Sequence, residues 1–239
     1  MSTNDILELD LDSIRDLIPS QLKETGVPSL ALAVAQGDRI IWEEAFGLAH
    51  RESGSQATPD TLYSLASISK PITATGLMVL VERGLIDLDR PANDYLGDGK
   101  LKAWIGRAED ATVRRLANHT SGLPTHYHFF FEDEPYSSPP MDETIRRYGN
   151  LVNPPGETYR YANLGYGILD HIIARVSGQT FAKFIHEEVF APLGMARSSI
   201  GLPQNLAPHH ATRYTNEGSP IPFYDFDHPG ASAAFCSAH

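Results

Sequence analysis

The segment from Pro71 to Arg83 limits most strongly what this chain can fold into, because it is apolar on nearly every side. Gly84 follows it directly, as is typical where a helix ends. A helix without a polar face has to be buried. The sequence therefore predicts a lobe that surrounds this helix, and a chain of 239 residues with 41% hydrophobic content is long enough to supply one.

A serine and a lysine stand at the entrance to this predicted helix, in the tetrapeptide Ser67-Ile-Ser-Lys70. Lys70 follows Ser67 by about one helical turn, so both side chains lie on one side. A desolvated lysine loses its proton more easily, and its neutral amine can accept the proton of a serine hydroxyl. The pair is a candidate for acyl transfer through serine. A serine that caps the helix beside a lysine that reaches solvent would give the same pattern.

Both short patterns recur elsewhere in the chain, so their surroundings have to separate them. Ser20-Gln-Leu-Lys23 repeats the serine–lysine spacing, but it falls in a predicted amphipathic surface helix that Gly26 closes. Tyr161-Ala-Asn163 offers a phenol and an amide, and the same spacing recurs at Tyr148-Gly-Asn150 and Tyr214-Thr-Asn216. Neither pattern assigns a site without its flanking segments.

The pattern of polar and apolar residues divides the chain into three stretches. Residues 1–50 predict a helix and a β-hairpin of an α/β lobe, and residues 51–205 predict a mostly helical lobe that carries the motifs. Residues 206–239 are irregular and form a return segment toward the α/β lobe, which we expect to be truncated. Two strands make a poor sheet with an unpaired edge, so we expect a second chain or a partner protomer to complete it.

Composition narrows the class of partner and the compartment. A formal net charge of −11 argues against nucleic acid and anionic membranes as partners. No run approaches the roughly 18 apolar residues of a membrane span. The single cysteine, Cys236, excludes an internal disulfide, and the first residues lack the pattern of a secretory signal. We therefore expect a cytoplasmic location.

No metal or cofactor is expected from the sequence. His126 and His128 place two imidazoles on one side of a predicted strand, but no third ligand stands at a useful spacing. A serine, an amine and a phenol can carry out acyl transfer without a metal.

Five segments in order resemble the serine β-lactamase-like family, in the branch of class C β-lactamases, esterases and D-aminopeptidases. The likeness covers residues 8–239. The segments are the surroundings of Ser67, Leu80–Pro91, Leu116–Pro124, Pro154–Asn163 and Pro192–Met195.

The resemblance implies an α+β, β-lactamase/transpeptidase-like fold, in which a helical lobe packs on an antiparallel sheet lobe that is incomplete in this chain. It implies Ser67 as nucleophile, Lys70 as base or proton relay, and Tyr161 as proton donor to the leaving group. Asn163 would orient the substrate or Lys70. The backbone N–H of Ser67 would donate to the oxyanion.

One family element is missing from its expected place. The family carries Lys-Thr-Gly or His-x-Gly on a strand beside the site, and that strand supplies the second oxyanion donor. His119-Thr-Ser-Gly122 belongs instead to the helical-lobe motif, and His228-Pro-Gly230 resembles the segment that precedes the missing element. We therefore expect weak catalysis at best from this chain alone.

Three functions remain open at this point. The first is a serine hydrolase acting through an acyl-enzyme on small esters or amides, as a carboxylesterase does. The second is a β-lactamase or D-specific peptidase, because the same residues permit a lactam or peptide substrate. The third is a catalytically incomplete fragment or pseudoenzyme that binds a partner or ligand.

Overall fold

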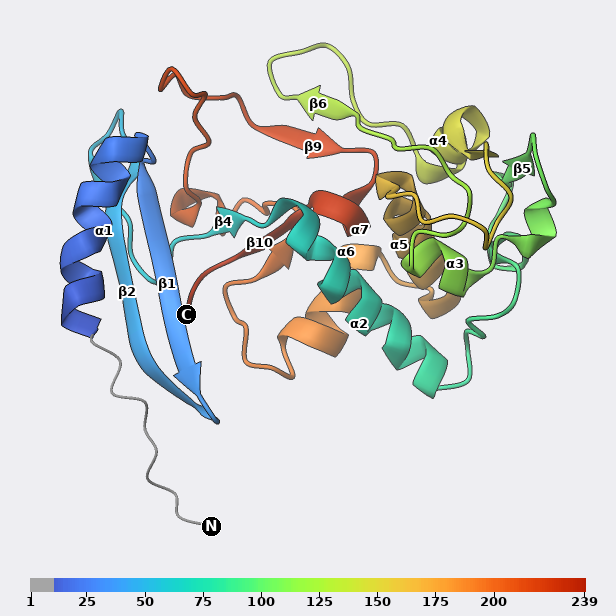
Figure 1. Ribbon diagram of the computed structural model, residues 1–239, viewed down its shortest axis with the longest axis horizontal. Coiled ribbons are helices and arrows are strands. Elements are labelled where there is room, and N and C mark those ends of the chain that lie inside the picture. Colours follow the sequence, from blue (N-terminus) through green and yellow to red (C-terminus); the bar gives the residue numbers. More distant parts are fainter. Residues whose placement is uncertain (1–10) are drawn as a thin grey trace. The chain divides into compact units, whose positions relative to one another are not determined.

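The computed structural model describes residues 11–239, and their contacts form two compact units (Figure 1). Unit 1 comprises the described residues up to Thr61 together with His209–Ile221 and Ser237–His239. Unit 2 comprises Leu62–Pro208 and Pro222–Cys236. The segment 206–239, expected as a single return stretch, is therefore shared between the two units.

Unit 1 is built from one helix and a small antiparallel sheet with the strand order β1-β2-β3. Its elements are α1 (Leu11–Thr25), β1 (Ser29–Gln36), β2 (Arg39–His50) and β3 (Ser55–Gln56). In Figure 1, α1 lies along the β1–β2 hairpin, and Arg15 Nε contacts Glu44 Oε2 at 2.7 Å. The predicted helix and hairpin are confirmed. Strand β3 has two residues, too few to show an alternating pattern.

Unit 2 contains the remaining elements, most of them helical. Its α-helices are α2 (Ser69–Glu82), α3 (Val113–Ala117), α4 (Met141–Tyr148), α5 (Asn163–Ser177), α6 (Phe181–Ile185) and α7 (Pro229–Ser232). Shorter helical turns are η1 (Ala66–Ile68), η2 (Ala92–Asp94), η3 (Ala108–Asp110), η4 (His186–Phe190) and η5 (Ala207–His209), the last of which ends at the boundary with unit 1. None of the helices described between residues 11 and 239 combines the length and apolar character needed to cross a bilayer.

Unit 2 also contains strands of two or three residues each. The sequence predicted only one strand in this region, through His126 and His128, but these two residues are irregular and β6 (Phe129–Phe131) begins directly after them. The strands form an antiparallel sheet β4-β10-β8, a parallel pair β5-β7 and an antiparallel pair β6-β9. Their bounds are β4 (Tyr63–Ser64), β5 (Lys102–Ala103), β6 (Phe129–Phe131), β7 (Asn150–Leu151), β8 (Ser199–Ile200), β9 (Tyr224–Phe226) and β10 (Ala234–Cys236). Strands this short are specified by their partners more than by their own residues.

The hydrophobic core of unit 2 contains much of α2 and most of α5. Leu77 and Leu80 of α2 are each 1% exposed, and Ile168 and Ile172 of α5 are fully buried. Met78, on another face of α2, remains 48% exposed. The expectation that this helix is buried on every side is therefore wrong, because a narrow strip that includes Thr75 and Met78 is exposed while the rest of the helix packs on the core of unit 2.

The short helix α7 is held closely between α2 and α5. A Cβ added at Gly230 would lie 2.6 Å from the backbone oxygen of Tyr166, so only glycine permits this approach. Gly230 N donates to Asp170 Oδ2 over 2.6 Å, and Thr73 Oγ1 donates to Gly230 O over 2.7 Å. These contacts fix the residues of α7 next to the start of α2.

Candidate active site

The Ser67 hydroxyl is presented by a strained turn at the start of α2. Ala66 has φ of 46°, a left-handed conformation that is unfavourable for residues other than glycine. Strand β10 holds the turn on both sides, since Leu65 N donates to Ala234 O and Ala234 N donates to Ser69 Oγ, each over 2.9 Å. Ser67 is exposed as a result, although Ser69 is fully buried.

The Lys70 amine is buried beside the Ser67 hydroxyl. Lys70 is 5% exposed, and its Nζ lies 3.1 Å from Ser67 Oγ. The amine also donates to Asn163 Oδ1 over 2.9 Å and to Ala231 O over 3.1 Å. Burial lowers the pKa of Lys70, and the neighbouring Tyr161 opposes this shift. The lysine is therefore closer to its neutral form than an exposed lysine is.

Tyr161 brings a second proton-carrying group to the same serine oxygen. Its phenol donates to Ser67 Oγ over 2.8 Å, and its ring centroid lies 4.7 Å from Lys70 Nζ. Asn163, the first residue of α5, is fully buried and donates from Nδ2 to the backbone oxygen of His126 over 2.9 Å. The four residues singled out from the sequence thus lie together in unit 2, and their catalytic roles stay predictions.

The competing matches have different surroundings. Ser20 is exposed on α1, and its hydroxyl donates to the backbone oxygen of Leu17 over 2.7 Å. Tyr214 belongs to unit 1, where its phenol donates to Glu52 Oε2 over 2.7 Å. Tyr148 packs its ring against His126, with the ring centroids 4.6 Å apart.

His119 is a site residue that sequence reasoning missed. It has a left-handed φ of 61°, and its ring centroid lies 4.5 Å from that of Tyr161. Its Nδ1 accepts a hydrogen bond from Ala162 N over 3.3 Å. Burial, and then the charge of Lys70, lower the pKa of His119, which favours a neutral imidazole. The only signal was its place in Leu116–Pro124, a segment assigned to the helical lobe without a role at the site.

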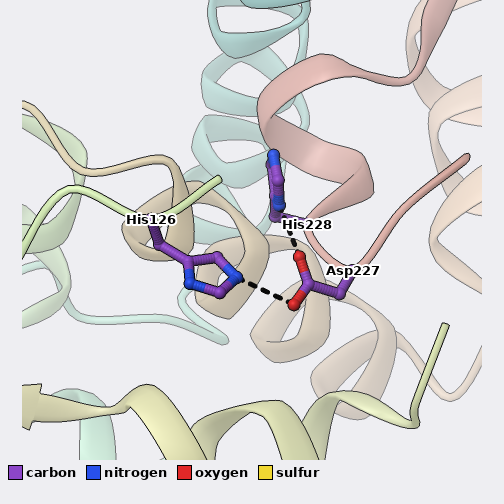
Figure 2. Close-up of side chains that lie close together, drawn as sticks. All are labelled: His126, Asp227 and His228. Carbon is purple, nitrogen blue, oxygen red and sulfur yellow. Dashed lines mark hydrogen bonds and ion pairs between the residues drawn. The ribbon is translucent and has the colours of Figure 1, made fainter. Parts of the chain in front are cut away.

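A second group of polar residues, His126, Asp227 and His228, lies together in unit 2 (Figure 2). His126 Nε2 lies 2.8 Å from Asp227 Oδ2, and His228 Nδ1 lies 2.6 Å from Asp227 Oδ1. One ligand atom from each residue lies within 4.8 Å of the other two, so the group has the residue types to hold a metal ion. The sequence pointed to no third ligand beside His126 and His128, because Asp227 and His228 lie far from them along the chain. His128 does not belong to the group and stacks on Phe130 instead.

Comparison with known proteins identifies the family. A family model described as Beta-lactamase matches residues 14–233. The chain is 30% identical over 189 residues to Penicillin-binding protein 4* of Bacillus subtilis (strain 168), covering 75% of this chain and 39% of that protein. It is 25% identical over 207 residues to Protein flp of Staphylococcus aureus (strain N315), covering 86% of this chain and 41% of that protein. The chain therefore spans less than half the length of these curated relatives.

Solved structures have the same fold. The octameric penicillin-binding protein homologue from Pyrococcus abyssi matches with a TM-score of 0.79 at 26% identity, over 96% of this chain and 54% of that chain. A class C β-lactamase matches with a TM-score of 0.79 at 21% identity, over 95% of this chain and 60% of that chain, and supports the fold alone. The expected α+β, β-lactamase/transpeptidase-like fold is confirmed. The match over residues 14–233 shows that this chain belongs to the serine β-lactamase-like family.

Proposed function

We propose that this chain is a serine hydrolase that acts on small esters or amides through an acyl-enzyme on Ser67. The observation that carries the proposal is the pair of contacts to Ser67 Oγ, 3.1 Å from Lys70 Nζ and 2.8 Å from the Tyr161 hydroxyl. Both distances are within the reach required of a general acid or base. Membership of the serine β-lactamase-like family supports the same reaction class.

The proposed reaction begins with neutral Lys70. Its amine takes the hydroxyl proton of Ser67 while Oγ attacks the carbonyl carbon and forms a tetrahedral oxyanion. The phenol of Tyr161 gives a proton to the leaving group, which departs and leaves the acyl-serine. Water then attacks the acyl carbon and loses a proton to the phenolate of Tyr161. Lys70 returns its proton to Ser67 Oγ as the acid departs, which restores both residues. The role of Asn163 is to hold the Lys70 amine.

Stabilisation of the oxyanion is proposed for the backbone N–H of Ser67. A single donor of this kind can lower the barrier by about 3 kcal/mol. A second donor is proposed to come from a second chain or a partner protomer that would complete the sheet. Activity of these 239 residues alone would then be weak.

A lactam or D-peptide substrate is the second candidate. The names of the matched proteins, penicillin-binding protein and class C β-lactamase, are the observation that supports this candidate. The acyl-serine step is common to all these substrates, so the site geometry supports each of them. The negative net charge supports a small molecule over nucleic acid as the partner.

Covalent labelling tests the proposal. The folded chain is incubated with a fluorophosphonate or a penicillin probe and analysed by intact and peptide mass spectrometry. An adduct on Ser67 is expected. Absence of any adduct on folded protein would contradict the proposal and favour a catalytically incomplete fragment or pseudoenzyme that binds a partner or ligand.

Substrate assays rank the two candidates. A short-chain p-nitrophenyl ester is compared with a chromogenic cephalosporin at equal concentrations. Faster release from the ester is expected. Release from the cephalosporin alone would reverse the ranking.

A further inference from the structure

Two chains of hydrogen bonds lead away from the Lys70 amine. Along the first, Lys70 Nζ donates to Asn163 Oδ1, and Asn163 Nδ2 donates to the backbone oxygen of His126, each over 2.9 Å. Along the second, Lys70 Nζ donates to Ala231 O over 3.1 Å, and Ala231 N donates to the backbone oxygen of His228 over 2.9 Å. Each chain of hydrogen bonds therefore ends at the backbone oxygen of a histidine, His126 in the first and His228 in the second.

The carboxylate of Asp227 joins these two histidines. Figure 2 shows it between the two rings. Its Oδ2 lies 2.8 Å from His126 Nε2, and its Oδ1 lies 2.6 Å from His228 Nδ1. Burial alone would raise the pKa of Asp227, but the hydrogen bonds from both rings lower it to about 2. An ionised carboxylate only accepts hydrogen bonds, so each ring presents an N–H to it. The two chains therefore close into a ring that begins and ends at Lys70.

Each acceptor of the Lys70 amine is oriented by this ring. The side-chain amide of Asn163 has an oxygen end and a nitrogen end, and the backbone oxygen of His126 can accept only from nitrogen. The contact with His126 therefore turns the oxygen of Asn163 toward the amine. Displacement of the segment that contains His126 would remove this constraint, and the amide could then present its own N–H groups to Lys70.

We propose that His126 and Asp227 are positioning residues that hold the acceptors of the Lys70 amine, and hence the amine itself, at its distance from Ser67 Oγ. Asp227 is fully buried as a side chain and His126 is 9% exposed, so neither has to touch the substrate to act in this way. The proposal rests on the proposed function of Lys70 as the base.

The test compares two neutral replacements of His126. His126→Gln keeps an N–H near the position of ring Nε2, whereas His126→Leu removes it. His128→Leu is the matched control, because His128 is exposed two residues further along the same segment. We expect His126→Leu to slow labelling of Ser67 by a fluorophosphonate by about tenfold to a hundredfold at saturating probe. His126→Gln should restore most of the rate, and His128→Leu should leave it unchanged.

The pKa of Lys70, measured by NMR of its labelled side chain, is the second readout and needs no turnover. Opening the ring admits water to the amine, and this weakens the burial that lowers the pKa. The pKa should therefore rise toward its ordinary value in His126→Leu and not in His126→Gln. Unchanged rates and pKa in folded His126→Leu would overturn the proposal.

Three further results keep the experiment decisive. If His126→Leu does not fold, Asp227→Asn replaces it, since an amide keeps the shape but cannot accept from both rings as they stand; wild-type values in this variant would overturn the proposal. If wild-type Ser67 is not labelled, the proposed function fails, while the NMR comparison still decides the positioning role. Binding of one Zn²⁺ that is lost in His126→Leu and kept in His128→Leu would overturn the proposal in favour of a metal centre.

Discussion

Replacing Lys70 by methionine should abolish most of the reactivity of Ser67 while leaving the fold intact. Methionine has an unbranched side chain of similar size but no amine, so Ser67 Oγ loses the base that lies 3.1 Å away. General bases typically contribute about 10²–10⁴-fold in rate. This corresponds to about 3–5 kcal/mol of barrier at about 1.4 kcal/mol per factor of ten.

The effect of this substitution on stability is much smaller, because two contributions oppose each other. The variant loses the hydrogen bonds from Lys70 Nζ to Ser67, Asn163 and Ala231, each with a net value of about 1 kcal/mol. It also no longer buries an amine, which costs about 1–3 kcal/mol. The free energy of unfolding should therefore change by no more than about 2 kcal/mol, compared with about 5–15 kcal/mol for a typical domain.

The assay is the rate of Ser67 labelling by a fluorophosphonate, followed by intact mass, with thermal unfolding measured in parallel. Lys23→Met is the matched control, because Lys23 follows Ser20 at the same spacing on the exposed helix α1. Labelling of folded Lys70→Met within about threefold of the wild-type rate would refute the role of the amine as base, since the expected loss is at least about a hundredfold.

Three further substitutions test other parts of the site. Tyr161→Phe keeps the ring but loses the phenol 2.8 Å from Ser67 Oγ, so ester hydrolysis should fall about a hundredfold with little change in melting temperature. Burial raises the pKa of Asp170 well above its ordinary value, so the free energy of unfolding of the wild type should fall as pH rises from the ordinary carboxyl pKa toward the folded pKa. Asp170→Asn should lack this fall in urea titrations from about pH 4 to about pH 8. A wild-type stability that does not depend on pH would contradict this prediction. Gly230→Ala places a Cβ 2.6 Å from Tyr166 O and should cost about 1–3 kcal/mol by thermal unfolding, whereas an unchanged melting temperature would show that α7 can shift.

The local parts of the site could be predicted from the sequence. The spacing of Ser67 and Lys70 on one helical turn places both side chains on the same side, whatever surrounds the helix. The flanking motifs then selected Tyr161 and Asn163 over competing matches, and the structure brings both to the Lys70 amine and Ser67 hydroxyl. The helix, the hairpin and the end of α1 at Gly26 followed from periodicity and glycine placement in the same way.

The surroundings of the amine could not be predicted in this way. The acceptor at Ala231 is a backbone oxygen, which every residue carries, so no sequence pattern could reveal it. Asp227 contacts His126 although the two residues lie 101 positions apart in the sequence. The short strands β4, β8 and β10 carry no alternation of their own and exist because they pair with one another. His119 likewise gains its contact with Tyr161 only through the fold.

The sequence by itself determined which residues carry the candidate chemistry and how Ser67 and Lys70 are spaced, because the helical repeat fixes neighbours one turn apart. Only the tertiary structure decided that the amine is buried among Asn163 and Ala231, and that a carboxylate far along the chain joins the segments holding them. The physical reason is that burial, and the pKa shift it causes, depend on close packing between distant segments, which local patterns do not encode.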